Sequence, residues 1–425
     1  MKTVVESSQQ VGTAWRNGPF QRFASATLIS ATGSAMAPLA LAYSVIEQGG
    51  GAGSLGLVLA VNTVPTIVFL LIGGLFADRL SRSRLLFLGN LLAACAQGAL
   101  AVTVATGHAT TVSIAACGFI SGTAASFIVP AAQGAVAQIV PEEHLQQANA
   151  LLRLPANAVR VLGPVVGGFV VAASGAAWAL AWDAVTFAVA AVLLLGMRLE
   201  APTAAPGGVL VDLRAGWTGF WSRTWLWTYT AAGTVLVAAW LAGFQLLGPL
   251  VAARQYAGAR DWGLIQAALA CGLLAGTLVC LRWKAYRLLA VAVATGGALV
   301  LPLTAMACGM PLPFVLVAAL LAGIGLDVAV VAWNTAFQQH VPAAEQGRMS
   351  AFNGVGERLA IPLGYLGAAF AADAWSSEGT LLACAGIIAL TTVLNLCVPD
   401  VHRVNRLTPS GRTRAVNEDR EVEQA

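Results

Sequence analysis

Apolar residues in this chain run on in stretches of about 20 or more, separated by short polar segments. A transmembrane helix needs about 20 mainly apolar residues, because each residue adds about 1.5 Å along the helix axis. Glycine and proline within a stretch do not argue against a helix, since neighbouring membrane helices supply packing and hydrogen bonds. The pattern predicts an all-α membrane protein with twelve transmembrane helices, near residues 23–46, 54–77, 85–106, 111–135, 150–173, 177–198, 225–250, 260–282, 286–308, 312–336, 349–372 and 378–398.

The polar segment between the second and third predicted helices is the most informative one. Residues 74–84 read Gly-Leu-Phe-Ala-Asp-Arg-Leu-Ser-Arg-Ser-Arg, with one acid and three arginines. Charged groups of this density are costly in hydrocarbon, so the segment must lie at a membrane surface. It therefore fixes the level at which both flanking helices end.

Composition agrees with a polytopic membrane protein. Of the 425 residues, 58% are hydrophobic and only 10% are charged, and the mean hydropathy is +0.77. A soluble domain carries about 25% charged residues, so that class is excluded. The net charge of +4 is explained by arginines retained on the cytoplasmic side, and nucleic acid is not expected as a partner. No apolar run with a small-residue cleavage site precedes the first helix, so we expect no cleaved signal peptide.

Lysines and arginines are distributed unequally between the two sides of the membrane. If the amino terminus is cytoplasmic, the outer segments receive only Arg254 and Arg260, and all other basic loops lie inside. An excess of lysine and arginine marks the cytoplasmic side. We therefore expect a multi-pass protein of the cell (plasma or inner) membrane with both termini in the cytoplasm.

The predicted helices divide the chain into two halves of six. We expect a cytoplasmic tail (1–22), a first half (23–198), a cytoplasmic linker (199–224), a second half (225–398) and a cytoplasmic tail (399–425). Apolar residues at helical spacing after residue 209 favour an amphipathic helix in the linker, with an ordinary loop as the alternative. The last segment is charged and lacks an apolar stripe, which predicts disorder.

The two halves show a weak internal repeat. With an offset of 201 residues, Gln-Ile-Val-Pro at 138–141 aligns with Gln-His-Val-Pro at 339–342, and Gly163 aligns with Gly364. Such matches in corresponding segments indicate two parallel six-helix repeats related by an axis along the membrane normal. This arrangement predicts a cavity between the halves near the midplane.

The loop sequence resembles the hallmark of the major facilitator superfamily of secondary transporters, which has the form GxxxDRxGRR. The matching residues start at Gly74 and include Asp78, Arg79 and Arg82; Ser81 replaces the family glycine, and Ser83 replaces a basic residue just before Arg84. The resemblance implies two six-helix pseudo-repeats, a small-molecule substrate and a cytoplasmic gate formed by Gly74, Asp78, Arg79, Arg82 and Arg84. Leu281 stands where the second half would carry the matching acid, so we expect a latch on one side only.

A second sequence pattern is similar to that of the drug-exporter branch. Residues 163–168 read Gly-Pro-Val-Val-Gly-Gly and match the GPxxGG core associated with exporters that are proton antiporters. The chain departs from that branch at Val159, where the family has glycine, and at Pro130, where it has arginine. The sequences at 247–252 and 338–342 resemble those of the macrolide and siderophore exporters. The antiporter-like positions are Gly163, Pro164, Gly167 and Gly168.

Proton coupling needs a group that titrates inside the membrane, and the predicted helices contain few. A buried acid near an arginine can be poised for this role. Asp327 and Glu357 are the main candidates for the proton carrier, although Glu357 and Arg358 could instead form a permanent structural pair. Asp183 lies near an outer helix end, where packing or capping is an alternative role. Arg160 could hold an anionic group or pair with an acid across the bundle.

These observations predict a transporter rather than an enzyme. Walker A, HExxH and GxSxG sequences are absent, and the seven cysteines and four histidines lack ligand spacing. We therefore expect no cofactor and no metal site. The expected function is proton-coupled efflux of an amphipathic small molecule by a monomer in the lipid bilayer. An importer or uniporter of a metabolite is an alternative within the class, and a non-transporting receptor or scaffold is one outside it.

Overall fold

A computed structural model describes residues 17–77, 81–141, 145–197, 199, 217–218, 220–283, 285–341 and 343–406. These residues are helical almost throughout. The first six long helices are α2 (Gly18–Glu47), α3 (Ala52–Ala77), α4 (Arg82–Ala105), α5 (Thr111–Ile139), α6 (Leu145–Ser174) and α7 (Ala176–Leu194). The remaining elements are α9 (Thr224–Trp240), η2 (Leu241–Leu247), α10 (Gly248–Gln255), α11 (Ala259–Arg282), α12 (Leu288–Gly296), η3 (Gly297–Leu299), α13 (Val300–Ala307), α14 (Leu312–His340), α15 (Ala343–Ala374), α16 (Ser377–Leu396) and α17 (Pro399–Arg403).

The long helices fall where the apolar stretches predict them. Within the described residues, 10 helical stretches are long and apolar enough to cross a membrane. The apolar part of α3 that meets the same test is shorter, Ala52–Pro65, and α15 is not among the 10. The predicted fold class is confirmed, whereas the count of twelve spanning helices stays a prediction for α3 and α15.

Helix ends follow local capping chemistry. α2 begins at residue 18 rather than at the predicted 23, because the Asn17 side chain accepts a hydrogen bond from the Phe20 amide and Pro19 occupies the first turn. Thr110 and Ser113 form a capping box at the start of α5. Between α6 and α7, Gly175 has a φ of 87°, a conformation that favours glycine.

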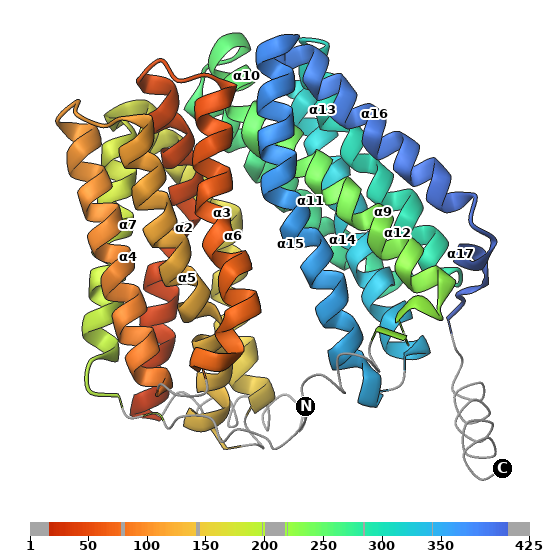
Figure 1. The fold of residues 1–425 in the computed structure, drawn as a ribbon, viewed down its shortest axis with the longest axis horizontal. Coiled ribbons are helices and arrows are strands. Elements are labelled where there is room, and N and C mark those ends of the chain that lie inside the picture. The colour runs from red at the N-terminus through yellow and green to blue at the C-terminus, as the bar shows by residue number, and fades with distance from the viewer. Residues whose placement is uncertain are drawn as a thin grey trace, which may run out of the picture.

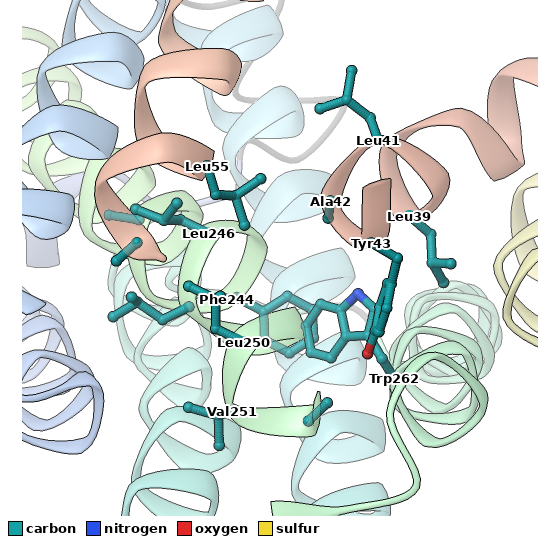
Figure 2. Packing of buried hydrophobic residues seen from close by; sticks show 14 of the residues in the cluster. Leu39, Leu41, Ala42, Tyr43, Leu55, Phe244, Leu246, Leu250, Val251 and Trp262 are labelled. Atoms are coloured by element: carbon teal, nitrogen blue, oxygen red, sulfur yellow. The ribbon is translucent and has the colours of Figure 1, made fainter. Parts of the chain in front are cut away.

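The helices form two bundles, α2–α7 and α9–α16, which diverge toward the end of the molecule where α2 begins and α16 ends (Figure 1). We call this end the terminus side and the opposite end the far side. On the far side, one apolar core contains residues of both halves, including Tyr43 and Leu55 from the first and Phe244 and Trp262 from the second (Figure 2). Toward the terminus side each half has its own core clusters. The halves are therefore held together at one end.

Corresponding helices of the two halves pack in the same way. A Cβ added to Gly163 of α6 would lie 2.3 Å from the Ala35 Cβ of α2. In the second half, a Cβ added to Gly364 of α15 would lie 3.2 Å from the Ala238 Cβ of α9. The two glycines are 201 positions apart and the two alanines 203, so the sequence repeat is also a repeat of helix contacts.

The seventh predicted span contains a wide turn that the apolar pattern does not predict. α9, η2 and α10 form one continuous stretch over Thr224–Gln255, and η2 is a seven-residue π-helix. Pro249 follows η2 by two residues and has no backbone N–H to continue regular hydrogen bonding. π-helical turns of this kind occur where the regular hydrogen-bond ladder is interrupted.

The predicted disorder after residue 398 is wrong for the first part of that tail. Residues 399–403 form α17, and Val401 and Val404 are buried against α12 and its neighbours. Arg406 donates from Nε to the Ala285 carbonyl at 3.1 Å. Two buried valines and these backbone contacts order the segment despite its charge. Residues 407–425 lie outside the described residues, as does most of the linker, whose residue Phe220 is buried against the second half.

Candidate functional site

Small residues close the far side between the two halves. A Cβ added to Gly56 of α3 would lie 2.6 Å from the Ala369 Cβ of α15, and one added to Gly168 of α6 would lie 3.1 Å from the Gly263 Cα of α11. Glycine at such positions lets helix backbones approach closely. The hydroxyl of Tyr43 donates to the Pro249 carbonyl at 3.4 Å, which adds a polar contact between the halves.

Arg160 lies near the middle of α6 and is exposed. Residues three, four, seven and eight positions further on share its helix face. Two of these, Gly163 and Gly167, contact α2, and Gly168 contacts α11 across the boundary between the halves. Arg160 therefore lies on the face that α6 turns toward the other half.

The opposite face of α6 carries large exposed apolar residues. Leu162 is 59% exposed, Val166 48% and Phe169 47%, as expected for a face in contact with lipid. Arg160 is on the other side of the helix, about 12 Å toward the terminus side from Gly168. Its exposure is thus to the space between the halves and not to lipid.

Arg358 occupies a comparable position in the second half. It is exposed on α15, seven residues before Tyr365 and eleven before Ala369, and all three share one helix face. Tyr365 and Ala369 contact Gly56 of α3 on the far side. Arg358 lies about 10 Å from Tyr365 toward the terminus side, so it also projects from the face turned to the other half.

Few groups could neutralise these arginines. The parts of α2 and α11 beside Arg160 contain no charged residue, and neither does any part of α3 or α9. Within the described part of the chain, the ion pair found joins Arg403 and Asp400, and neither Arg160 nor Arg358 makes a hydrogen bond. The side chain of Glu357, one residue before Arg358, lies outside the described residues.

Asp327 lies within the second half, between α14 and α11. Its Oδ2 accepts a hydrogen bond from the Thr277 hydroxyl at 2.9 Å, and its side chain is half-buried. Gly276 permits the close approach, since an added Cβ would lie 2.8 Å from the Asp327 Cβ. The carboxylate has one neutral donor and is near the middle of a spanning helix, so a change in its protonation would alter the α11–α14 contact.

Asp183 is buried inside the first half, away from the boundary with the second. It is 0% exposed on α7, and neither carboxylate oxygen has a hydrogen-bond partner. A Cβ added to Gly33 of α2 would lie 2.5 Å from its Oδ1, and the side chains of Ser34 and Gln97 lie near it. The structure therefore groups Asp183 with α2 and α4 and does not bring it to Arg160 or Asp327.

The structure describes all of the GPxxGG motif but only part of the loop motif. Gly163, Gly167 and Gly168 of the GPxxGG sequence all lie at helix contacts within a continuous α6 that includes Pro164. Of the loop motif, Gly74 lies in α3 and Arg82 and Arg84 lie in the first turn of α4. Asp78 and Arg79 lie outside the described residues, so the latch remains a prediction.

Sequence reasoning missed three glycines at the boundary between the halves: Gly53, Gly56 and Gly263. A Cβ added to Gly53 would lie 2.8 Å from the Asp373 Oδ2. The cluster of glycines over residues 49–56 was a usable signal for close packing. Among the described residues no group of three or more His, Cys, Asp or Glu side chains could hold a metal ion, and all seven cysteines are free.

Comparison with known proteins agrees with this architecture. The chain is 26% identical over 412 residues to the multidrug efflux pump Tap of Mycolicibacterium fortuitum, which covers 92% of this chain and 98% of Tap. It is 26% identical over 224 residues to the enterobactin exporter EntS of Salmonella typhi, covering 52% and 54% of the two chains.

Solved structures resemble the fold at low sequence identity. A bacterial homologue of the iron transporter ferroportin in the inward-facing state has a TM-score of 0.69 at 15% identity, covering 89% of this chain and 99% of that one. The outward-facing structure of a bacterial ferroportin homologue has a TM-score of 0.58 at 15% identity, with 89% and 98% covered. The family model described as Major Facilitator Superfamily matches residues 23–365. This chain is a member of the Major Facilitator Superfamily.

Proposed function

We propose that this chain exports an amphipathic small molecule across the cell membrane by alternating access, with protons as the coupling ion. The observation that carries the proposal is the two-half architecture, in which one apolar core joins the halves on the far side and separate cores hold them on the terminus side. Two rigid bundles joined at one end can rock about the contacts between α3 and α15 and between α6 and α11.

The similarity to known exporters favours efflux over uptake as the direction of transport. The match to a multidrug efflux pump spans nearly the whole of both chains, and the shorter match is to an enterobactin exporter. The excess of lysine and arginine in the loops supports a cytoplasmic location for the terminus side. On that assignment the described state is inward-facing, which is the state in which an exporter collects its substrate.

Proton coupling rests on the acids within the membrane. Asp327 is the acid that we assign to this role, because it is half-buried, lies near the middle of α14 and bonds to Thr277 on a helix that contacts the other half. Glu357 remains the second candidate. Protonation of Asp327 removes its negative charge and changes how α11 and α14 are held together.

The test is accumulation of a fluorescent drug in cells that lack their own efflux pumps. Cells that overproduce the chain should hold less drug than control cells, and a protonophore should abolish the difference. Faster inward flux would instead identify an importer or uniporter. No change in flux for a broad set of drugs and metabolites would point to a receptor or scaffold.

A further inference from the structure

Two arginines in the middle of spanning helices lie on faces that meet the other half. Charged side chains at this depth are costly unless they are paired or lie in a water-filled space. Arg160 and Arg358 are both exposed, and neither has a partner among the described residues. Two positive charges at this depth raise the free energy of the protein, and an anionic ligand bound to them would offset that cost.

The two positions match in depth as well as in direction. Arg160 lies about 12 Å and Arg358 about 10 Å toward the terminus side from the glycine contacts that close the far side. One belongs to the first half and the other to the second. Arg160 lies along the α6–α11 contact and Arg358 along the α3–α15 contact, so each half places one guanidinium group beside the space between the halves.

Among the described side chains, few acids lie on the helices beside the two arginines. α3 and α9 contain no acid, and the acids of α2 and α11 are confined to the helix ends, at Glu47 and Asp261. Arg153 is also exposed on the Arg160 face, two turns nearer the terminus side. Two arginines on the same face of α6 give the space between the halves a positive electrostatic potential, which attracts anions.

We propose that Arg160 and Arg358 bind an anionic group of the transported molecule, such as a carboxylate, phosphate or phenolate, with one arginine from each half. This inference rests on the proposed transport function and narrows its substrate to amphipathic anions. The guanidinium group suits such ligands because it donates two parallel hydrogen bonds to their oxygen atoms. A single anion held from both sides attracts the two halves toward each other, which links occupancy to closure on the terminus side.

Binding to the purified full-length protein tests the proposal without requiring transport. Carboxyfluorescein and rhodamine 123 share a xanthene ring system but are anionic and cationic, respectively, so fluorescence polarisation with each dye isolates the effect of charge. We expect carboxyfluorescein to bind at least tenfold more tightly than rhodamine 123. Arg160→Gln and Arg358→Gln should each weaken carboxyfluorescein binding about tenfold, the usual size of a lost charge-assisted hydrogen bond.

Three controls make the outcome specific. Arg160→Lys keeps the charge but loses the paired donors, so its affinity for carboxyfluorescein should lie between those of Arg160→Gln and the wild type. Arg403→Gln alters an exposed arginine outside the two bundles and should change nothing. Thermal unfolding of each variant verifies folding, which should be intact because neither arginine makes a hydrogen bond or an ion pair with a described residue.

The proposal is wrong if carboxyfluorescein binds no more tightly than rhodamine 123, or if the glutamine variants bind it as well as the wild type does. Drug export in cells is measured with the same variants. Export by a protein that shows no anion preference would overturn the arginine site and leave the transport function intact. Arginine-dependent dye binding without export would do the reverse.

Discussion

At the residue scale, charged side chains within the spanning helices have different surroundings, which depend on the helix face that carries them. Arg160 and Asp183 both lie within spanning helices, yet Arg160 is exposed between the halves and Asp183 is completely buried among α2, α4 and α7. Asp327 is intermediate, with one hydrogen bond to the neighbouring helix. Each of these environments leads to a separate expectation for substitution.

Asp327→Asn should abolish transport driven by a proton gradient in proteoliposomes. Asparagine keeps the size of the side chain but cannot take up and release a proton, while substrate exchange without a gradient should continue. Thr277→Val removes the hydroxyl donor to Asp327 and should slow transport without abolishing it. Asp400→Asn, in α17 outside the two bundles, is the matched control. Unchanged coupling in Asp327→Asn would contradict the assignment.

Asp183→Asn should fold and unfold at the same temperature as the wild type or a higher one. A negative charge is unfavourable at a buried site without a cation, so replacing the carboxyl group by an uncharged amide of the same shape should stabilise the fold by about 1 kcal/mol or leave its stability unchanged. Thermal unfolding in detergent measures this, with Asp373→Asn at an exposed position for comparison. A marked loss of stability in Asp183→Asn would mean that the negative charge itself is needed.

At the element scale, close helix contacts depend on individual glycines and on one widened turn. Gly248 follows the π-helix η2, and a Cβ added there would lie 2.2 Å from the Trp262 ring of α11. That ring also packs against Phe244, with 4.8 Å between centroids and 51° between the ring planes, in the core shared by both halves. The turn thus brings α10 against α11 at the closed end.

Gly248→Ala should lower stability by about 1–3 kcal/mol, because the added methyl group has no room beside a buried tryptophan. Gly233→Ala is the matched control in the same span, since nothing lies within 4 Å of its added Cβ. That substitution should raise stability by up to about 1 kcal/mol through helix propensity. Thermal unfolding of the two variants should therefore shift in opposite directions, and equal shifts would contradict the packing of Trp262.

At the scale of the whole molecule, transport by rocking requires the far-side contacts to open. Gly53 and Asp373 belong to opposite halves and are close enough to test for a disulfide, given 3.9 Å from an added Gly53 Cβ to the Asp373 Cγ. In a background without native cysteines, Gly53→Cys with Asp373→Cys should cross-link under oxidation and stop transport. A reducing agent should restore it.

Each single cysteine variant controls for the substitution itself and should transport normally in either condition. Cross-linked protein that still transports would show that the far side does not need to open, and alternating access about these contacts would be wrong. The latch predicted for Asp78 stays a prediction, because that residue lies outside the described residues.

The sequence by itself determined the class, the helices and the family. Apolar length is a local property, so the stretches predicted the membrane helices, and capping and proline chemistry adjusted their ends. The loop and GPxxGG sequences identified the family because each needs specific residues at fixed spacing. The repeat of helix contacts could also be anticipated from the offset of 201 residues.

Only the tertiary structure decided which charged residues face the space between the halves and which are buried within one half. Arg160, Asp183 and Asp327 look alike in sequence, as single charges within apolar stretches, whereas Arg358 directly follows Glu357. Their surroundings differ because the packing of helix faces is set by contacts between residues far apart in the chain, such as Gly56 with Ala369. The wide turn before Pro249 and the order of α17 likewise depend on partners that lie elsewhere in the chain.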